Sequence, residues 1–489
     1  MRPTHRPLTT VALALCLFMA ALEMTVVSTA MPTVVSELGG LESYAWVFTS
    51  YMLSSTITVP IFGKLADLYG RKPVLLFGIV LFLIGSIASG LSTSMSMLIA
   101  FRTLQGLGAG AMQPVSLTII GDIYTLEQRA KVQGAFSGVW GLAGLVGPLT
   151  GGLIVKYLTW HWVFFINVPV GLAALGLLLG FFHEQVQRKP QKLDFAGAAL
   201  LSGGVVALLF GVQSLGRNLL ALPVAAVLLI AFVLVERKVA EPVIPPSLFK
   251  IPAIAISSAA GALFSAAMFG ATTYVPLYVQ GVLGGSATLA GGMITPMIVG
   301  WPLASLVAGR LLLKTGFRPL IVGGLGLTVL GTGLMALFLN PHSSILVPEL
   351  AMALFGIGLG FTATALLIAV QTSVGWELRG VATASHMFFR TIGGALGVGL
   401  MGGVLVSHLL KDPRVPVSAA NELLGPEHGR GLPADVLQTL SGALGTGLSI
   451  NFWIICAATI AAFAAGLFFP KSKREPGTSL PTTDVAAPH

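Results

Sequence analysis

The sequence is poor in charge, because Asp, Glu, Lys and Arg make up only 9% of its 489 residues. An ordinary soluble domain carries about 25%. The hydrophobic fraction is 55% and the mean hydropathy is +0.89. These values argue against a water-soluble fold, and also against disorder, which requires low hydrophobicity. Cysteine is scarce as well: Cys16 and Cys456 lie in apolar stretches and indicate neither a disulfide framework nor a metal site.

Several signatures of chemistry are missing. No Gly-x-x-x-x-Gly-Lys-Ser/Thr run exists, so the chain lacks the phosphate-binding loop of an ATP-driven pump. The histidines show no HExxH spacing and have no cysteine partner, so we expect no metal site, no cofactor and no enzymatic activity. The net charge of +9 could suit a polyanion, but the basic residues form short groups between apolar runs. We therefore expect no nucleic-acid partner.

Long apolar runs dominate what is present. A membrane-spanning helix needs about 20 mostly apolar residues, and we find fourteen candidate segments in the sequence. They are roughly 9–31, 46–63, 73–90, 97–120, 132–155, 162–182, 195–213, 219–235, 253–280, 289–309, 319–339, 346–370, 381–408 and 446–469. We predict an all-α polytopic membrane protein with fourteen transmembrane helices, embedded in a lipid bilayer as a monomer.

The distribution of Lys and Arg predicts the orientation. Most of the 27 basic residues fall in the two tails and in the connections that follow the even-numbered segments. Cytoplasmic loops are enriched in Lys and Arg, so we expect both termini on the cytoplasmic side of the cell inner (plasma) membrane. The stretch 409–445, which contains four prolines, is then expected to be an external loop, either a solvated connection or a lid over an outer opening.

The chain repeats itself at a spacing near 250 residues. Glycines and an arginine recur at this offset: Gly106, Gly108, Gly110, Arg129, Gly144 and Gly147 are matched by Gly356, Gly358, Gly360, Arg379, Gly394 and Gly397. We predict two parallel six-helix bundles with pseudo-twofold symmetry, residues 1–190 and 251–470. Residues 191–250 form an inserted two-helix linker, and 471–489 a disordered cytoplasmic tail. Such repeats are a transporter architecture with the site between the halves.

Charged residues that occur in only one copy are the strongest functional candidates, since symmetric packing does not require them. Three of them lie away from the segment ends: Glu23 aligns with Ala267, Arg102 with Met352, and Arg390 with Trp140. A charge at that depth costs roughly 2.5–3.5 kcal/mol, and an arginine cannot lose its proton. We expect Arg102 to contact Glu23 as a proton-dependent pair; a permanently satisfied structural pair is the alternative.

The substrate is expected to bind between the halves, near the middle of the membrane. We predict a cavity lined by Met, Phe and small residues, with Met24, Phe264, Phe269, Tyr274, His386, Phe388 and Arg390 as candidate lining residues. Core packing is the alternative for the apolar members of this set. The proton-coupling scheme also requires the Glu23 carboxyl to reach the groove between the halves.

Several motifs resemble one transporter family. Gly63-Lys-Leu-Ala-Asp67-Leu-Tyr-Gly70-Arg71-Lys72 resembles the hallmark loop of the major facilitator superfamily. The stretch from Gly138 to Gly152 is similar to the antiporter motif of that superfamily. The stretch from Leu22 to Pro32 resembles the first-helix signature of its fourteen-helix drug:proton antiporter branch, with Glu23 in place of the usual Asp. Arg102 to Gly110 and Trp162 to Pro169 also fit that branch.

The resemblance implies roles for these motifs. Gly63, Asp67, Gly70, Arg71 and Arg129 would form a conformational latch, in which Asp67 caps a helix N-terminus or pairs with Arg71 or Arg129. The antiporter motif of the fifth segment would permit close packing and a bend where the halves meet. Its residues are Gly144, Gly147, Pro148, Gly151 and Gly152.

The expected function is therefore proton-coupled antiport. The protein would export small amphipathic, cationic or neutral, drug-like compounds by alternating access, with a proton gradient in place of a cofactor. Such an exporter can confer antibiotic resistance. Two alternatives stay open: an exporter of lipid or envelope components, and a proton-coupled metabolite importer.

Overall fold

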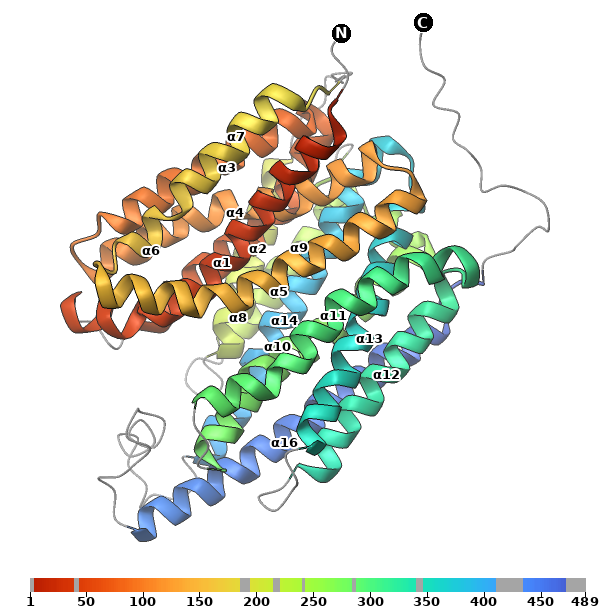
Figure 1. The fold of residues 1–489 in the computed structure, drawn as a ribbon. Helices are drawn as coiled ribbons and strands as arrows, with labels where there is room; N and C mark the ends of the chain where they lie inside the picture. Colours follow the sequence, from red (N-terminus) through yellow and green to blue (C-terminus); the bar gives the residue numbers. More distant parts are fainter. Residues whose placement is uncertain are drawn as a thin grey trace, which may run out of the picture.

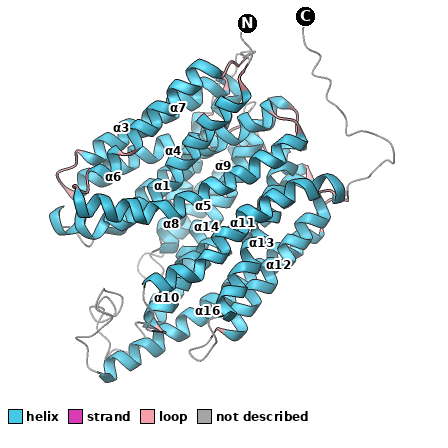
Figure 2. Ribbon diagram, viewed as in Figure 1, coloured by secondary structure: helices cyan, strands magenta, loops and turns pink. Residues whose placement is uncertain are grey.

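The structure is a computed structural model that describes residues 4–38, 44–184, 194–213, 220–239, 242–283, 287–339, 346–409 and 434–471. Every regular element in these ranges is helical (Figure 2). The predicted tail 471–489 lies outside the described residues except for Lys471.

The described residues of the first half, within 4–184, form seven helices, drawn in red to yellow in Figure 1. They are α1 (Arg6–Leu38), α2 (Tyr44–Tyr69), α3 (Arg71–Gly90), α4 (Met95–Ile123), α5 (Leu126–Tyr157), α6 (Trp162–Phe165) and α7 (Asn167–Phe181). The predicted segment 162–182 coincides with α6 and α7, which are separated at Ile166. Two shorter apolar helices follow, α8 (Phe195–Gln213) and α9 (Ala221–Glu236), and they pack on each other.

The second half of the chain is drawn in green to blue in Figure 1. It comprises α10 (Pro252–Gly281), α11 (Ala287–Thr315), α12 (Phe317–Phe338), α13 (Leu346–Thr372), α14 (Arg379–Leu409) and α16 (Ala434–Leu467), with the 3-10 turns η2 (Pro246–Lys250) and η3 (Trp376–Leu378). The predicted external loop 409–445 is wrong for residues 434–445, which belong to α16. Pro433 is the last of the four prolines, so no proline interrupts a helix that begins at Ala434.

Nine helices in the described ranges are long and apolar enough to cross a membrane. Each of the fourteen predicted segments falls on a helix, but the number that cross a membrane stays a prediction.

Corresponding helices pack in the same pairs in the two halves. Helix α2 packs on α4 as α11 packs on α13, and α1 packs on α5 as α10 packs on α14. The repeated glycines explain these close approaches. A Cβ at Gly106 would press on Tyr51 and Ser54 of α2, and a Cβ at Gly356 would press on Met297 of α11. The pseudo-twofold relation itself remains a prediction that this packing favours.

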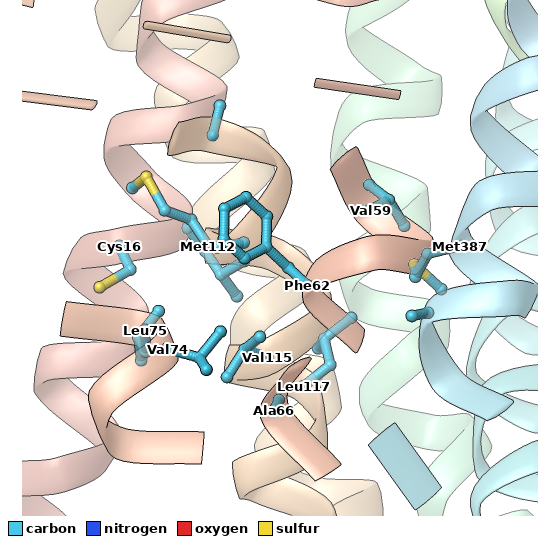
Figure 3. Packing of buried hydrophobic residues seen from close by; sticks show 14 of the residues in the cluster. Cys16, Val59, Phe62, Ala66, Val74, Leu75, Met112, Val115, Leu117 and Met387 are labelled. Carbon is cyan, nitrogen blue, oxygen red and sulfur yellow. The ribbon is translucent and has the colours of Figure 1, made fainter. Parts of the chain in front are cut away.

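The two halves meet along α2 with α14 and along α5 with α11. Buried residues of α14 belong to the apolar core of the first half, as Met387 does in Figure 3, where it lies near Val59 of α2. In a bilayer, such contacts are stabilised by close van der Waals packing between the helices. The halves therefore share a continuous apolar contact in this conformation.

Candidate functional site

A cavity of about 240 Å³ lies between the two halves. Helices α1, α4 and α5 line it from one side, and α10, α11, α13 and α14 line it from the other. The walls are mostly apolar and aromatic, with a few polar side chains, which is the usual composition of a small-molecule site. Among the described lining residues there is no Asp or Glu, and Arg390 is the one charged side chain.

Residues separated by the repeat offset of 250 line this cavity in pairs. Trp140 of α5 corresponds to Arg390 of α14, and Gln113 of α4 corresponds to Ala363 of α13. Gly141 and Thr391 make a third such pair. The cavity therefore lies where a pseudo-twofold axis between the halves is expected, but its two walls differ in chemistry.

The structure places the predicted lining residues in two groups. Phe269 and Arg390 line the cavity, and so does Gly144 of the fifth-segment motif. The other five do not belong to its lining: they are Met24, Phe264, Tyr274, His386 and Phe388. Phe264 and Tyr274 are buried in the core of the second half, while Phe388 is buried in the core of the first half and Met24 packs against it. Protein interiors are close-packed, so most apolar side chains on the inward faces of helices contact neighbouring helices and do not line a cavity.

Arg390 is held from its own half of the protein. Its Nε donates to Ser265 Oγ at 3.5 Å, and its guanidinium lies 5.1 Å from the ring centroid of Phe264. A Cβ at Gly261 would press on the Arg390 stem and on His386, so this glycine allows α10 and α14 to hold the side chain between them. His386 itself is fully buried one turn before Arg390.

Glu23 lies in a polar network inside the first half. Its carboxylate accepts hydrogen bonds from Arg102 and, at 2.6 Å, from Asn167 Nδ2. Arg102 also donates to Gln105 Oε1 at 2.8 Å and to the carbonyl oxygen of Val47 at 3.2 Å. The Arg102 guanidinium lies 4.3 Å from the ring centroid of Tyr51. This contact between Glu23 and Arg102 is the one that the repeat analysis predicted; its role in proton coupling remains a prediction.

The network is closed in this conformation. Glu23 and Arg102 are each 1% exposed, and neither belongs to the lining of the central cavity. The requirement that the carboxyl reach the groove is therefore not met here. Proton exchange at Glu23 needs a second conformation in which the pair with Arg102 opens.

Sequence reasoning missed three members of this network. They are Ser86 of α3, Gln105 of α4 and Asn167 of α7, which bond to one another around the ion pair. Gln105 aligns with Phe355 at the repeat offset. The single-copy test would therefore have found it, had the test been applied to uncharged polar residues as well as to charged ones. Asn167 stands at the start of α7, directly after the interruption at Ile166, and the interruption brings its amide to the Glu23 carboxylate.

The second predicted site lies at the connections α2–α3, α4–α5 and α13–α14, which we call the latch end. Asp67 accepts hydrogen bonds from the backbone N–H groups of Gly380 and Val381, at 3.2 and 2.7 Å. These residues form the first turn of α14, so Asp67 caps a helix of the opposite half. Arg71 pairs with Asp67 at 2.8 Å. The structure thus shows the capping and the Arg71 contact, while the latch function remains a prediction.

A second acid connects the halves beside Asp67. Asp122, at the end of α4, pairs with Arg71 at 3.1 Å and with Arg379 at 2.6 Å. Arg379 also donates to the carbonyl oxygen of Gly121 at 2.9 Å. Sequence reasoning gave Asp122 no role, although it aligns with Thr372 at the repeat offset and is therefore another single-copy acid.

Arg71 is also fixed by Trp376. Its NH2 group donates to the Trp376 carbonyl oxygen at 3.0 Å, and the guanidinium lies 4.0 Å from the centroid of the indole ring. Arg129 does not contact Asp67: its Nε donates to the carbonyl oxygen of Tyr124 at 2.9 Å. Burial raises the pKa of Asp67, which lies beyond the apolar stretch 46–63, to about 7, although Arg71 opposes this shift.

The remaining glycines of both motifs have separate surroundings. A Cβ at Gly63 would collide with Ala384 of α14, and a Cβ at Gly147 would collide with Thr25 of α1. Gly70 has a φ of 99° where α2 passes into α3, a conformation that favours glycine. Gly151 is buried and Gly152 is exposed, and the side chain of Pro148 lies outside the described residues.

The fold defines a class, a polytopic helical membrane transporter, and the cavity lies between two bundles as this class favours. The family model of the Major Facilitator Superfamily matches residues 13–398. The chain therefore belongs to the major facilitator superfamily, whose members are transporters and not enzymes.

Curated relatives extend this result. The multidrug transporter protein MdtP of Bacillus subtilis is 39% identical over 426 residues, which is 85% of this chain and 79% of that protein. Multidrug resistance protein 3 of the same organism is 36% identical, with 80% and 78% covered. Among solved structures, the human organic anion transporter MFSD10 has a TM-score of 0.64 at 16% identity, with 94% of this chain and 100% of that chain covered. At that identity the likeness shows the fold alone.

Proposed function

We propose that this protein exports amphipathic drug-like compounds across the plasma membrane by alternating access, in exchange for protons. The observation that carries the proposal is the mostly apolar cavity between the halves, to which both halves contribute paired positions. Relatives named as multidrug transporters support the choice of drug-like substrates. The efflux pump dotC of Dothistroma septosporum, 32% identical with 97% of this chain and 86% of that protein covered, supports the outward direction.

The latch end supports the alternating-access part of the proposal. Asp67, Arg71, Asp122 and Arg379 bridge the halves on one side of the cavity. If this side is cytoplasmic, as the Lys and Arg distribution predicts, the structure represents a state closed toward the cytoplasm. Opening the cavity inward then requires these ion pairs and the cap on α14 to break.

Glu23 is the candidate for proton coupling within this proposal. It is a single-copy acid inside a candidate span, and its partner Arg102 cannot lose its proton. Protonation of Glu23 weakens its attraction to Arg102, which links proton binding to a rearrangement of α1 against α4. One proton moving down roughly 100 mV supplies about 2.3 kcal/mol, and one pH unit adds about 1.4 kcal/mol.

The test uses Glu23→Gln in inverted membrane vesicles with an acidic lumen. We expect this variant to lose gradient-driven accumulation of a fluorescent amphipathic dye while it retains dye binding in detergent. Glu127→Gln is the matched control, because Glu127 is exposed in the first turn of α5. Unchanged accumulation in Glu23→Gln overturns the coupling role. Accumulation that needs an alkaline lumen overturns antiport.

A further inference from the structure

Arg390 is half-buried, and it differs from the buried arginines in its partners. Arg71 and Arg102 each pair with a carboxylate, and the half-buried Arg379 does so as well. Within the part of the chain that the structure describes, no carboxylate pairs with Arg390. Its contacts are Ser265 Oγ, Met387 Sδ at 3.9 Å and the face of Phe264. None of these neutralises the guanidinium, which stays charged.

The Arg390 guanidinium contacts two side chains of the cavity lining, Ser265 and Met387. Arg390 lines the cavity, and its stem is confined between α10 and α14 by the close approach at Gly261. The described lining contains no acid that could pair with it or with a cationic substrate. A substrate cation would lie near an unneutralised guanidinium in an apolar cavity, where like charges repel strongly.

Two tryptophans from different halves supply aromatic surface to the cavity. Trp140 occupies the position that corresponds to Arg390 in the first half, and Trp301 of α11 lines the same cavity. Indole rings bury large apolar area and stack on planar groups, and a guanidinium binds a carboxylate through paired hydrogen bonds. The cavity therefore offers a guanidinium and indole rings, which match the two ends of a molecule with an acidic group and an aromatic body.

We propose that the central cavity recognises amphipathic compounds that carry an acidic group, with the anion bound by Arg390 and the aromatic body held against Trp140 and Trp301. This inference rests on the proposed export function and assigns its substrate class. It replaces the cationic part of the expectation drawn from the sequence, which named Arg390 as a lining candidate but could not show that the described lining holds no acid.

Binding is measured by isothermal titration calorimetry on the full-length protein in nanodiscs, without a gradient. Three probes share one aromatic body: naphthalene-1-acetate, the neutral naphthalene-1-acetamide, and 2-(naphthalen-1-yl)ethylammonium. In the wild type we expect the acetate to bind at least about tenfold more tightly than the ammonium, with the amide between them. Arg390→Gln should weaken the acetate to the level of the amide and leave the amide within about twofold.

Two further variants separate charge from structure. Arg390→Lys should retain part of the preference for the acetate, because the charge remains while the paired geometry is lost. Arg310→Gln removes an exposed cation of α11 outside the cavity lining and should leave all three affinities unchanged. Should Arg390→Gln fail to fold, the wild-type ranking and Arg390→Lys still decide the question.

A wild type that binds the ammonium as tightly as the acetate overturns the proposal, and so does an acetate preference that survives in Arg390→Gln. These outcomes are distinct from failure of the proposed function. Intact preference for the acetate without gradient-driven export overturns export alone, whereas export of dyes without any charge preference overturns the substrate class alone.

Discussion

Arg102 shows at the scale of one residue how a buried charge is tolerated in this fold. It pairs with Glu23, bonds to Gln105 and the Val47 carbonyl, and lies over Tyr51. Removing one partner of a buried ion pair costs about 3–5 kcal/mol, because the other charge is left uncompensated. We therefore expect Arg102→Met to lower the melting temperature of the purified protein. Thermal unfolding monitored by tryptophan fluorescence measures this change.

The double variant Glu23→Gln with Arg102→Met provides the control for this prediction. It removes both charges, so it should recover part of the stability that Arg102→Met alone loses. A double variant that melts below both single variants would show that the pair acts through packing and not through charge.

The residue scale also shows where sequence reasoning succeeds and where it stops. The search for single-copy charges predicted the contact between Glu23 and Arg102. It did so because an acid in an apolar helix can be stabilised by few groups, and a nearby arginine is one of them. The cavity lining was harder: Phe264 is fully buried in the core while Trp301 lines the cavity. Both are apolar residues in helices, and helical periodicity is the same whether a face meets another helix or an open space.

At the scale of elements, Gly63 determines how closely α2 approaches α14. A Cβ there would collide with the Ala384 side chain, so Gly63→Ala should separate the two helices at the latch end. Adding Ala384→Gly restores the space and should restore the approach. Spin labels are attached at Lys131→Cys and Leu378→Cys, which are exposed positions in opposite halves. Separation of the helices is measured as a longer distance between the two labels. The native cysteines are buried and therefore shielded from the label. An unchanged distance in Gly63→Ala would contradict the role of this contact.

Helix existence was predictable throughout the described ranges, but helix ends were not. Each apolar segment predicted a helix, since about 20 apolar residues have few alternatives in a membrane. The ends depend on contacts made elsewhere: α14 begins at Arg379, where Asp67 of the other half caps its first N–H groups. Such a cap joins residues more than 300 positions apart, and no local pattern around Arg379 encodes it.

At the scale of the whole molecule, Asp67 makes closure of the latch end depend on pH. Burial raises its pKa to about 7 from 3.8, and burial raises the pKa of Asp122 as well. In an opened latch end both carboxyls are hydrated and titrate near 4, so the open state loses its protons first as the pH rises. Closure is therefore favoured below about pH 4 and weakens progressively up to about pH 7.

Across pH 5 to 8, the distance between the labels at 131 and 378 should lengthen. Asp67→Asn should remove much of this dependence and leave the part due to Asp122, while Glu127→Gln, which changes an exposed acid, should behave as the wild type. A distance that shortens as the pH rises would contradict this assignment, because ionised Asp67 would then stabilise the closed state.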